Sequence, residues 1–161
     1  MMSHIGSRGR FFEDFKIGDV YKHSLGRTIT DADNIWFTLL TCNPNPIHFD
    51  YEYAKKTRFK KPLVNSTFTL ALVTGLSVAD VSRNGINLQW DKVFLPAPLF
   101  VGDTVYAETE VLGARESKSK PEFGIVNVRT RGINQEGKVV IEFERTIMVY
   151  KRDHAPKTMA G

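Results

Sequence analysis

The residues best suited to chemistry lie in one short segment, residues 43–50, with the sequence NPNPIHFD. His48 is the side chain that most readily takes up and releases a proton near neutral pH, as a general acid or base must. Pro44 and Pro46 restrict the backbone, so less conformational freedom is lost when polar groups are held in place. The residues alone leave two other interpretations open, in which Asn43 caps a helix and His48 is a hydrogen-bonded structural residue. The remaining histidines lie in tail or strand contexts and make weaker candidates: His4, His23 and His154.

A second candidate is a dense run of cations, formed by Lys55, Lys56, Arg58, Lys60 and Lys61. One interpretation is a solvated helix end, where positive charge suits the helix dipole. The other is a docking point for a small phosphorylated ligand. The whole chain has a net charge of only +4, from 22 Lys and Arg against 18 Asp and Glu. A dedicated nucleic-acid binder concentrates far more positive charge on one face.

The first half of the chain holds the elements that must position these residues. A strand broken by glycine is predicted over residues 19–29. Thr30 then caps a helix that we expect to end near Cys42, because Pro44 and Pro46 disfavour helical geometry before them. The segment 43–50 is therefore predicted to be a rigid loop, and a short polar helix is predicted over residues 51–60.

The second half begins with a segment that is apolar or small nearly all round, residues 66–82. A helix without a polar face is predicted to be buried. Four strands follow, at about residues 88–95, 105–111, 123–133 and 139–149, and a hairpin turn lies at 134–137. In the last strand Arg145 falls among the inward-facing apolar positions, where it marks an edge, a bulge or an interface.

Length and composition indicate one ordinary domain. The chain has 161 residues, of which 42% are hydrophobic and 25% charged. We expect a domain over residues 11–152, a flexible tail over 1–10 and a second tail over 153–161. A single cysteine and no secretory signal favour a cytoplasmic protein. The cysteine and four scattered histidines offer no metal-ligand spacing, and no redox-cofactor motif is present. The pattern predicts an α+β fold, with an antiparallel sheet wrapped around one long buried helix.

Residues 37–54, FTLLTCNPNPIHFDYEYA, resemble the hydratase-2 motif of the MaoC-like dehydratases, the R-specific enoyl-CoA hydratases. The family pattern has an aromatic residue, a spacer, Gly-Asp-x-Asn-Pro-aliphatic-His, and a small residue six positions later. Asn45, Pro46, Ile47, His48 and Ala54 match it. The resemblance extends over roughly residues 12–150, through segments 62–64 and 98–104. It implies a single hot-dog domain that adds or removes water across the 2,3 double bond of an enoyl thioester.

The chain departs from the family pattern at two places. The family's Gly-Asp is Cys42-Asn43 here, and the His-Gly that opens the buried helix is Asn65-Ser66. The resemblance implies that His48 is the main acid/base and that Asn43 orients the water without taking its proton. Either His48 then serves both proton transfers, or Asp50 or a substrate carboxylate replaces the missing acid. The departures resemble a subgroup associated with branched or dicarboxylic substrates such as mesaconyl-CoA.

The resemblance also implies the substrate contacts and the assembly. The Ser66 N–H is expected to hold the enolate oxygen. The other expected substrate-binding residues are Asn45, Val64, Asn65, Lys60 and Lys61, of which the lysines face the coenzyme A phosphates. No cofactor is expected beyond the coenzyme A of the substrate, and the expected partners are an acyl-CoA thioester and further copies of the chain in a homodimer or higher homo-oligomer. Neither nucleic acid nor membrane insertion is expected.

Two other functions stay open from the sequence. A non-catalytic hot-dog subunit would bind acyl chains or support an active partner, and Asn43 is its main support. A hot-dog thioesterase would need a carboxylate or nucleophile on the buried helix, where Asp80 is the available acid.

Overall fold

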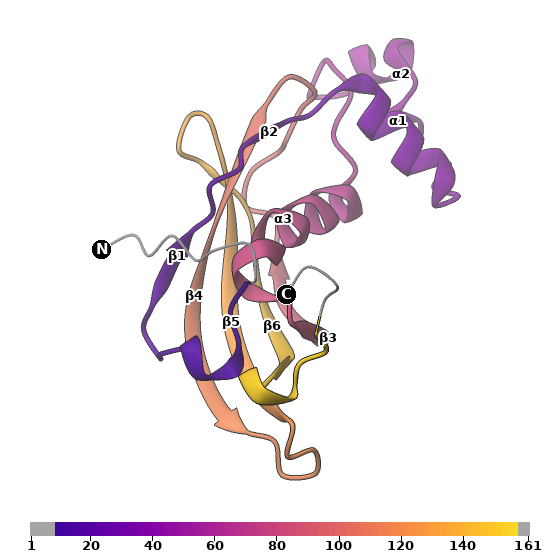
Figure 1. The fold of residues 1–161 in the computed structure, drawn as a ribbon. Helices are drawn as coiled ribbons and strands as arrows, with labels where there is room; N and C mark the ends of the chain where they lie inside the picture. Colours follow the sequence, from indigo (N-terminus) through magenta and orange to yellow (C-terminus); the bar gives the residue numbers. More distant parts are fainter. Residues whose placement is uncertain (1–8, 158–161) are drawn as a thin grey trace.

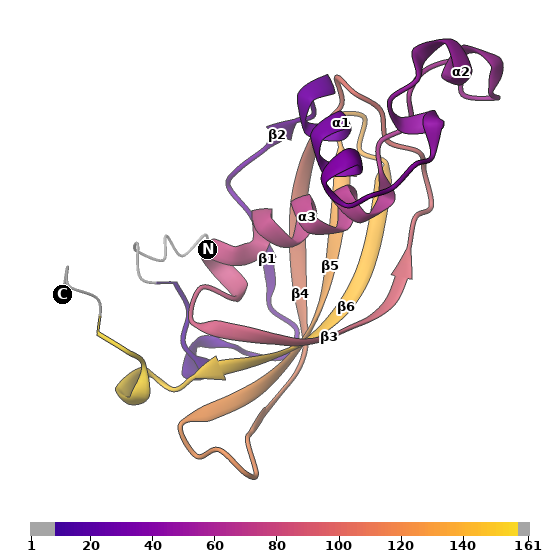
Figure 2. The same ribbon diagram turned by 90° about the vertical axis from the view of Figure 1, so that its right-hand side faces the viewer.

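One helix lies across a twisted antiparallel sheet, and the computed structural model describes this arrangement for residues 9–157. The sheet has the strand order β1 (Val20–Lys22), β4 (Thr104–Glu116), β5 (Phe123–Asn134), β6 (Val139–Tyr150) and β3 (Gly85–Phe94). The short β2 (Arg27–Thr28) also pairs with β4. Helix α3 (Ser66–Val81) crosses one face of the sheet (Figure 1 and Figure 2). The predicted α+β architecture is confirmed.

Most predicted elements are present with shifted ends. The strand expected over 19–29 is split into β1 and β2 around Gly26. A Cβ atom at Gly26 would lie 2.4 Å from Cε1 of Tyr106, so any other residue here would push the half-exposed Tyr106 ring aside. Helix α2 (Tyr51–Lys56) is shorter than the predicted 51–60, because the chain leaves the helix at Thr57 with an extended backbone.

The sheet has an apolar inner face and a charged outer face. On β6, Ile141, Phe143 and Ile147 are buried beneath α3. Outward-facing Glu142 and Glu144 pair instead with arginines of β5, as the alternation in the sequence predicts. The inner face therefore forms the core and the outer face is polar.

Helix α3 buries only one side within this chain. Its buried stripe is Thr69, Val73, Ser77 and Val81, at a spacing of four residues. The opposite side carries small or apolar residues that are exposed: Ala71, Gly75, Val78 and Ala79. The prediction of burial all round was wrong in this respect, because a helix without a polar face does not require that both of its sides be covered.

The remaining helices gather beyond the N-terminal end of α3. Helix α1 (Asp31–Leu40), the 3-10 turn η2 (Pro46–His48) and α2 lie together at this end of the molecule (Figure 2). Thr30 caps α1 by accepting a hydrogen bond from the Asp33 N–H, as predicted. The loop with His48 is thereby placed next to the start of α3.

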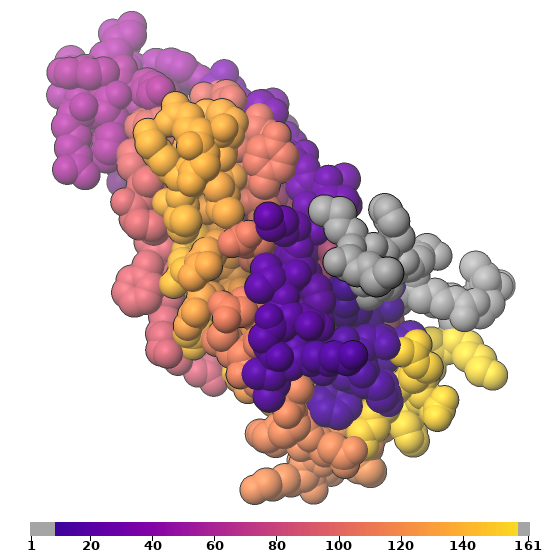
Figure 3. Space-filling view, turned by 90° about the vertical axis from the view of Figure 1, so that its left-hand side faces the viewer, coloured from indigo at the N-terminus to yellow at the C-terminus, as the bar shows by residue number. Residues whose placement is uncertain are grey.

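The opposite end of α3 meets the N-terminal segment, which contains the 3-10 turn η1 (Phe12–Asp14). Figure 3 shows the indigo N-terminal part of the chain on the face that it draws, where β1 pairs with β4 and η1 contacts β5. Gly9 and Arg10 are buried although both fall within the expected tail 1–10, so these two residues are packed against the rest of the domain. Residues 1–8 and 158–161 lie outside the described part of the chain, and a 3-10 turn, η3 (Arg152–His154), spans the boundary between the expected domain and the expected second tail. The domain bounds 11–152 stay a prediction.

Candidate functional site

His48 is held by both its backbone and its ring. It lies in η2, which begins after the rigid Pro-containing turn. Its Nδ1 is 2.7 Å from the carbonyl oxygen of Leu63, to which it donates its proton. Within residues 9–157 its Nε2 has no hydrogen-bond partner, although the residue is only 7% exposed. The Nδ1 contact sets the tautomer, so the neutral ring presents an unprotonated Nε2.

Asn34 on α1 connects the His48 loop to the start of α3. Its Nδ2 donates to the carbonyl oxygens of His48, at 3.0 Å, and of Leu63, at 3.1 Å. Its Oδ1 accepts from the backbone N–H of Asn65 at 2.9 Å. Asn34 is 1% exposed, so these bonds are shielded from water. This residue was not predicted, and the only signal for it was a polar residue four positions before Thr38 on one face of α1.

The start of α3 presents a free backbone donor. Asn65 caps the helix, since its Oδ1 accepts from the Thr67 N–H at 3.0 Å. Its Nδ2 donates to Thr38 Oγ1 at 3.1 Å, so both ends of the buried Asn65 amide are engaged within the protein. The Ser66 N–H has no acceptor among the described residues, as expected for the first residue of a helix. The positive end of the helix dipole and this N–H together suit an anionic oxygen.

The two side-chain amides of the His48 loop, Asn43 and Asn45, stabilise the conformation of its backbone. Asn43 Oδ1 accepts from the Asn45 N–H at 3.0 Å, and Asn45 Oδ1 accepts from the Ile47 N–H at 3.2 Å. Cys42 before them has a φ of 57°, which turns the chain out of α1. Asn43 therefore keeps its Nδ2 donor available, whereas exposed Asn45 acts as the cap of η2.

A pocket of about 270 Å³ opens beside Ser66. Leu63, Val64, Ser66 and Thr69 line one side, and residues 95–99 with Val140 line the other. Val64, one of the expected substrate-binding residues, lines this pocket, and its N–H donates to the carbonyl oxygen of Leu99 at 2.9 Å, which joins the two sides. The pocket therefore places the exposed start of α3 beside a mostly apolar space, which is large enough for a short hydrocarbon chain.

Of the cationic run 55–61, Arg58 lines this pocket, and its neighbour Phe59 lines it as well. The predicted Lys60 and Lys61 are exposed and do not line it. The Lys61 Nζ lies 4.1 Å from the centre of the Phe100 ring, and Lys60 has a φ of 62°. A role of these lysines at the coenzyme A phosphates stays a prediction, while Arg58 is the residue of this cluster that the fold brings to the pocket.

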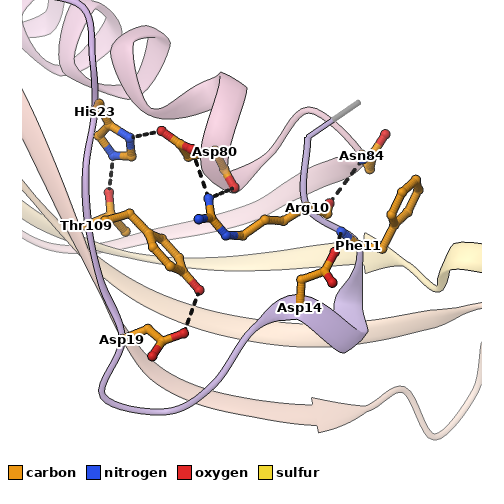
Figure 4. Close-up of polar contacts among 9 residues, drawn as sticks. Arg10, Phe11, Asp14, Asp19, His23, Asp80, Asn84 and Thr109 are labelled. Carbon is orange, nitrogen blue, oxygen red and sulfur yellow. Dashed lines mark hydrogen bonds and ion pairs between the residues drawn. The ribbon is translucent and has the colours of Figure 1, made fainter. Parts of the chain in front are cut away.

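Two acids considered from the sequence are already engaged. Asp50 caps α2 by accepting from the Tyr53 N–H at 2.9 Å. Asp80 lies at the far end of α3, where it accepts from Arg10 at 2.9 Å and from His23 Nδ1 at 2.8 Å (Figure 4). Burial alone would raise the pKa of Asp80, but hydrogen bonds from His23 and Arg10 outweigh it and hold the pKa below 3.8. A carboxylate bound in this way is poorly placed to act as the base of a thioesterase.

The Asp80 cluster continues inward as Asp80–His23–Thr109, an acid–imidazole–hydroxyl series (Figure 4). His23 Nε2 accepts from Thr109 Oγ1 at 2.8 Å, and Thr130 Oγ1 follows at 3.0 Å. Such a series resembles a nucleophilic triad. Thr109 is fully buried, however, so no substrate reaches its hydroxyl. The cluster instead fastens the N-terminal segment and β1 to the end of α3.

We expect this cluster to make the stability of the protein sensitive to pH. Burial lowers the pKa of His23 below 6.5, despite the opposing hydrogen bond with Asp80. Below about pH 6.5 the unfolded chain takes up a proton that the folded chain refuses, so the free energy of unfolding falls by up to about 1.4 kcal/mol per pH unit. The contribution of Asp80 is lost only at lower pH, because its pKa is also lowered.

Denaturant unfolding between pH 7.5 and pH 5 measures this effect. We expect His23→Gln to flatten the loss of stability, and His154→Gln, at an exposed position, to leave it unchanged. An equal pH slope in His23→Gln and the wild type would contradict the assignment.

Residues 9–157 contain no cluster of three or more His, Cys, Asp or Glu side chains that could hold a metal. No helix in this described part is long and apolar enough to cross a membrane.

The chain is similar in sequence to a known family and to several known proteins. The sequence pattern of the family described as MaoC like domain matches residues 13–132. Mesaconyl-CoA hydratase of Cereibacter sphaeroides is 35% identical, over 91% of this chain and 43% of its own length. The (R)-specific enoyl-CoA hydratase of Rhodospirillum rubrum is 32% identical, over 88% of this chain and 93% of its own.

Two solved structures share the fold. A putative MaoC domain protein dehydratase from Chloroflexus aurantiacus superposes with a TM-score of 0.86 at 33% identity, over 95% of this chain and 44% of the other. A Mycobacterium tuberculosis protein with a double hot-dog fold gives 0.84 at 25% identity, over 98% of this chain and 49% of the other. The chain thus has the hot-dog fold, and it spans about half the length of the first curated relatives it matches.

Proposed function

This chain belongs to the family of MaoC-like domains, and we propose from that membership that it catalyses the reversible addition of water to an enoyl-CoA thioester. The observation that carries the proposal is the orientation of His48. Its Nδ1 donates to Leu63, which leaves Nε2 as a base beside the segment that leads to the free Ser66 N–H. A base and an oxyanion donor near a short-chain pocket are the groups that this reaction needs.

The geometry suits a mechanism in which one group moves both protons. His48 Nε2 takes a proton from water while the water oxygen bonds to C3 and the electrons of the double bond move toward the thioester oxygen. The Ser66 N–H stabilises the resulting enolate. The imidazolium then returns the proton to C2, which completes the addition. Asn43 holds the water oxygen through Nδ2, since its Oδ1 is engaged with Asn45.

A non-catalytic subunit is the second candidate, and the amide at Asn43 favours it. An asparagine cannot accept the proton that the family's aspartate accepts. His48 and its hydrogen bonds are retained, however, and a chain kept only for assembly has no need of a free Nε2. Asn43→Asp separates the two candidates, because it restores the carboxylate of the family pattern.

The experiment follows the enoyl-thioester absorbance with crotonyl-CoA and, separately, mesaconyl-CoA. We expect turnover of at least one by the wild type. Absence of turnover on both, with activity appearing only in Asn43→Asp, would establish a site retained for binding or assembly.

A homodimer is part of the proposal and rests on the open edge of β3. This strand ends the sheet and pairs only with β6 among the described strands. It carries exposed Ile86, Leu88, Trp90 and Phe94. A long apolar edge of this kind invites pairing with another strand.

We expect Leu88→Lys to convert the dimer to a monomer, because a lysine on an edge strand opposes pairing. Light scattering after size exclusion measures the mass. Val20→Lys, an exposed apolar residue on the opposite edge strand β1, is the matched control and should stay dimeric. A Leu88→Lys protein of unchanged mass would contradict an interface at β3.

A further inference from the structure

Among the residues that the structure describes, Arg58 is the only charged one that lines the pocket beside Ser66. Most of the other lining residues are apolar, among them Phe59, Leu63 and Leu99. The volume of about 270 Å³ lies just below the range of roughly 300–1,000 Å³ that is typical of ligand pockets, so the pocket suits a small group. A single guanidinium on the wall of a small apolar pocket is the arrangement expected where one anionic group of a short ligand must be recognised.

The guanidinium of Arg58 has no anionic partner within residues 9–157. Five other arginines of this part of the chain are in ion pairs: Arg10, Arg27, Arg129, Arg131 and Arg152. Arg58 instead lies over the ring of Phe59, with Cζ 4.7 Å from the ring centre, and Phe59 contacts Phe100 at a centroid distance of 6.0 Å. Stacking on a ring orients the planar guanidinium, while the N–H donors at its edge stay free to form a bidentate pair with a carboxylate.

The surroundings of the pocket favour a negative ligand group. No Asp or Glu of residues 9–157 lines it, and the N-terminal end of α3 adds a positive dipole at Ser66. Asn43 further removes the negative charge that the family pattern places in the adjoining loop. The thioester oxygen at the Ser66 N–H and an anionic group at Arg58 would both lie within this one pocket.

We propose that Arg58 recognises a free carboxylate on the acyl group, so that the substrates are short dicarboxylic enoyl thioesters. This inference rests on the proposed function, whose reaction it narrows to one substrate class. The same guanidinium chemistry would also bind a phosphate of coenzyme A. The test below therefore varies the acyl group and the carrier separately.

Binding of unreactive saturated thioesters tests the inference without requiring turnover. Calorimetry measures Kd for succinyl-CoA, which has the extra carboxylate, for butyryl-CoA, which lacks it, and for coenzyme A alone. We expect Arg58→Gln to raise the Kd for succinyl-CoA by about 10- to 100-fold, as for a lost hydrogen-bonded charge pair. The Kd values for butyryl-CoA and coenzyme A should rise by less than about threefold. Arg58→Lys keeps the charge but not the fork, and should fall between Arg58→Gln and the wild type.

The controls separate the possible failures. Arg115→Gln removes an exposed guanidinium on β4, and should bind all three ligands like the wild type. Equal weakening of all three ligands in Arg58→Gln would show a phosphate contact, and no weakening would show no contact, so either result overturns the inference. Turnover of crotonyl-CoA reports separately on the proposed reaction, whether or not Arg58 binds a carboxylate.

Discussion

Replacing His48 with asparagine is expected to lower kcat/KM for the enoyl thioester substrate by about 10³-fold, within the range that loss of a general acid/base produces. The amide Nδ2 of asparagine takes the place of the imidazole Nδ1 and can still donate to the carbonyl oxygen of Leu63. What is lost is Nε2, the atom assigned to both proton transfers. We therefore expect the free energy of unfolding to change by less than about 1 kcal/mol.

Alanine at the same position is the informative contrast. His48→Ala removes Nε2 and also leaves the Leu63 carbonyl without its donor, so both activity and stability should fall. His154→Asn, at an exposed position, controls for loss of a histidine elsewhere and should retain full activity. If His48→Asn keeps activity within tenfold of the wild type, the proton passes through another group.

Much of the fold was predictable because its signals are local and repeated. The alternation along β6 and the apolar segment of α3 each extend over ten residues or more, so a few mismatched positions do not hide them. The end of α2 was placed too late because the residues after Lys56 remain compatible with a helix. The Thr57 hydroxyl instead bonds back to the Ala54 carbonyl, and the chain turns away.

The residues of the candidate site could be predicted from the sequence only where they belong to a continuous motif or element. His48 and its prolines form a continuous motif, and Ser66 follows from the start of a clear helix. Arg58 was not separable from its neighbouring lysines, because the path of the loop decides which cation reaches the pocket. Asn34 was missed since its partners lie 14 and 29 positions along the chain, and no local pattern reports such pairings.

Asn34→Asp is expected to be the most damaging of the isosteric changes at this end of the molecule. The carboxylate can still accept from the Asn65 N–H, but it cannot donate to the His48 and Leu63 carbonyls. It would instead place a buried negative charge against two carbonyl oxygens. By analogy with an uncompensated buried charge, we expect a loss of about 3–5 kcal/mol in the free energy of unfolding, measured by urea denaturation.

The same change at Asn45 is the matched control. Asn45 is exposed and uses only its Oδ1, as an acceptor from Ile47, so Asn45→Asp keeps that contact and should be as stable as the wild type. Since Asn34 joins both the His48 loop and the start of α3, any folded Asn34→Asp protein should also have lower kcat/KM, through misplacement of Nε2 relative to the Ser66 N–H. An Asn34→Asp protein with wild-type stability would mean that the three contacts of Asn34 do not hold the site together.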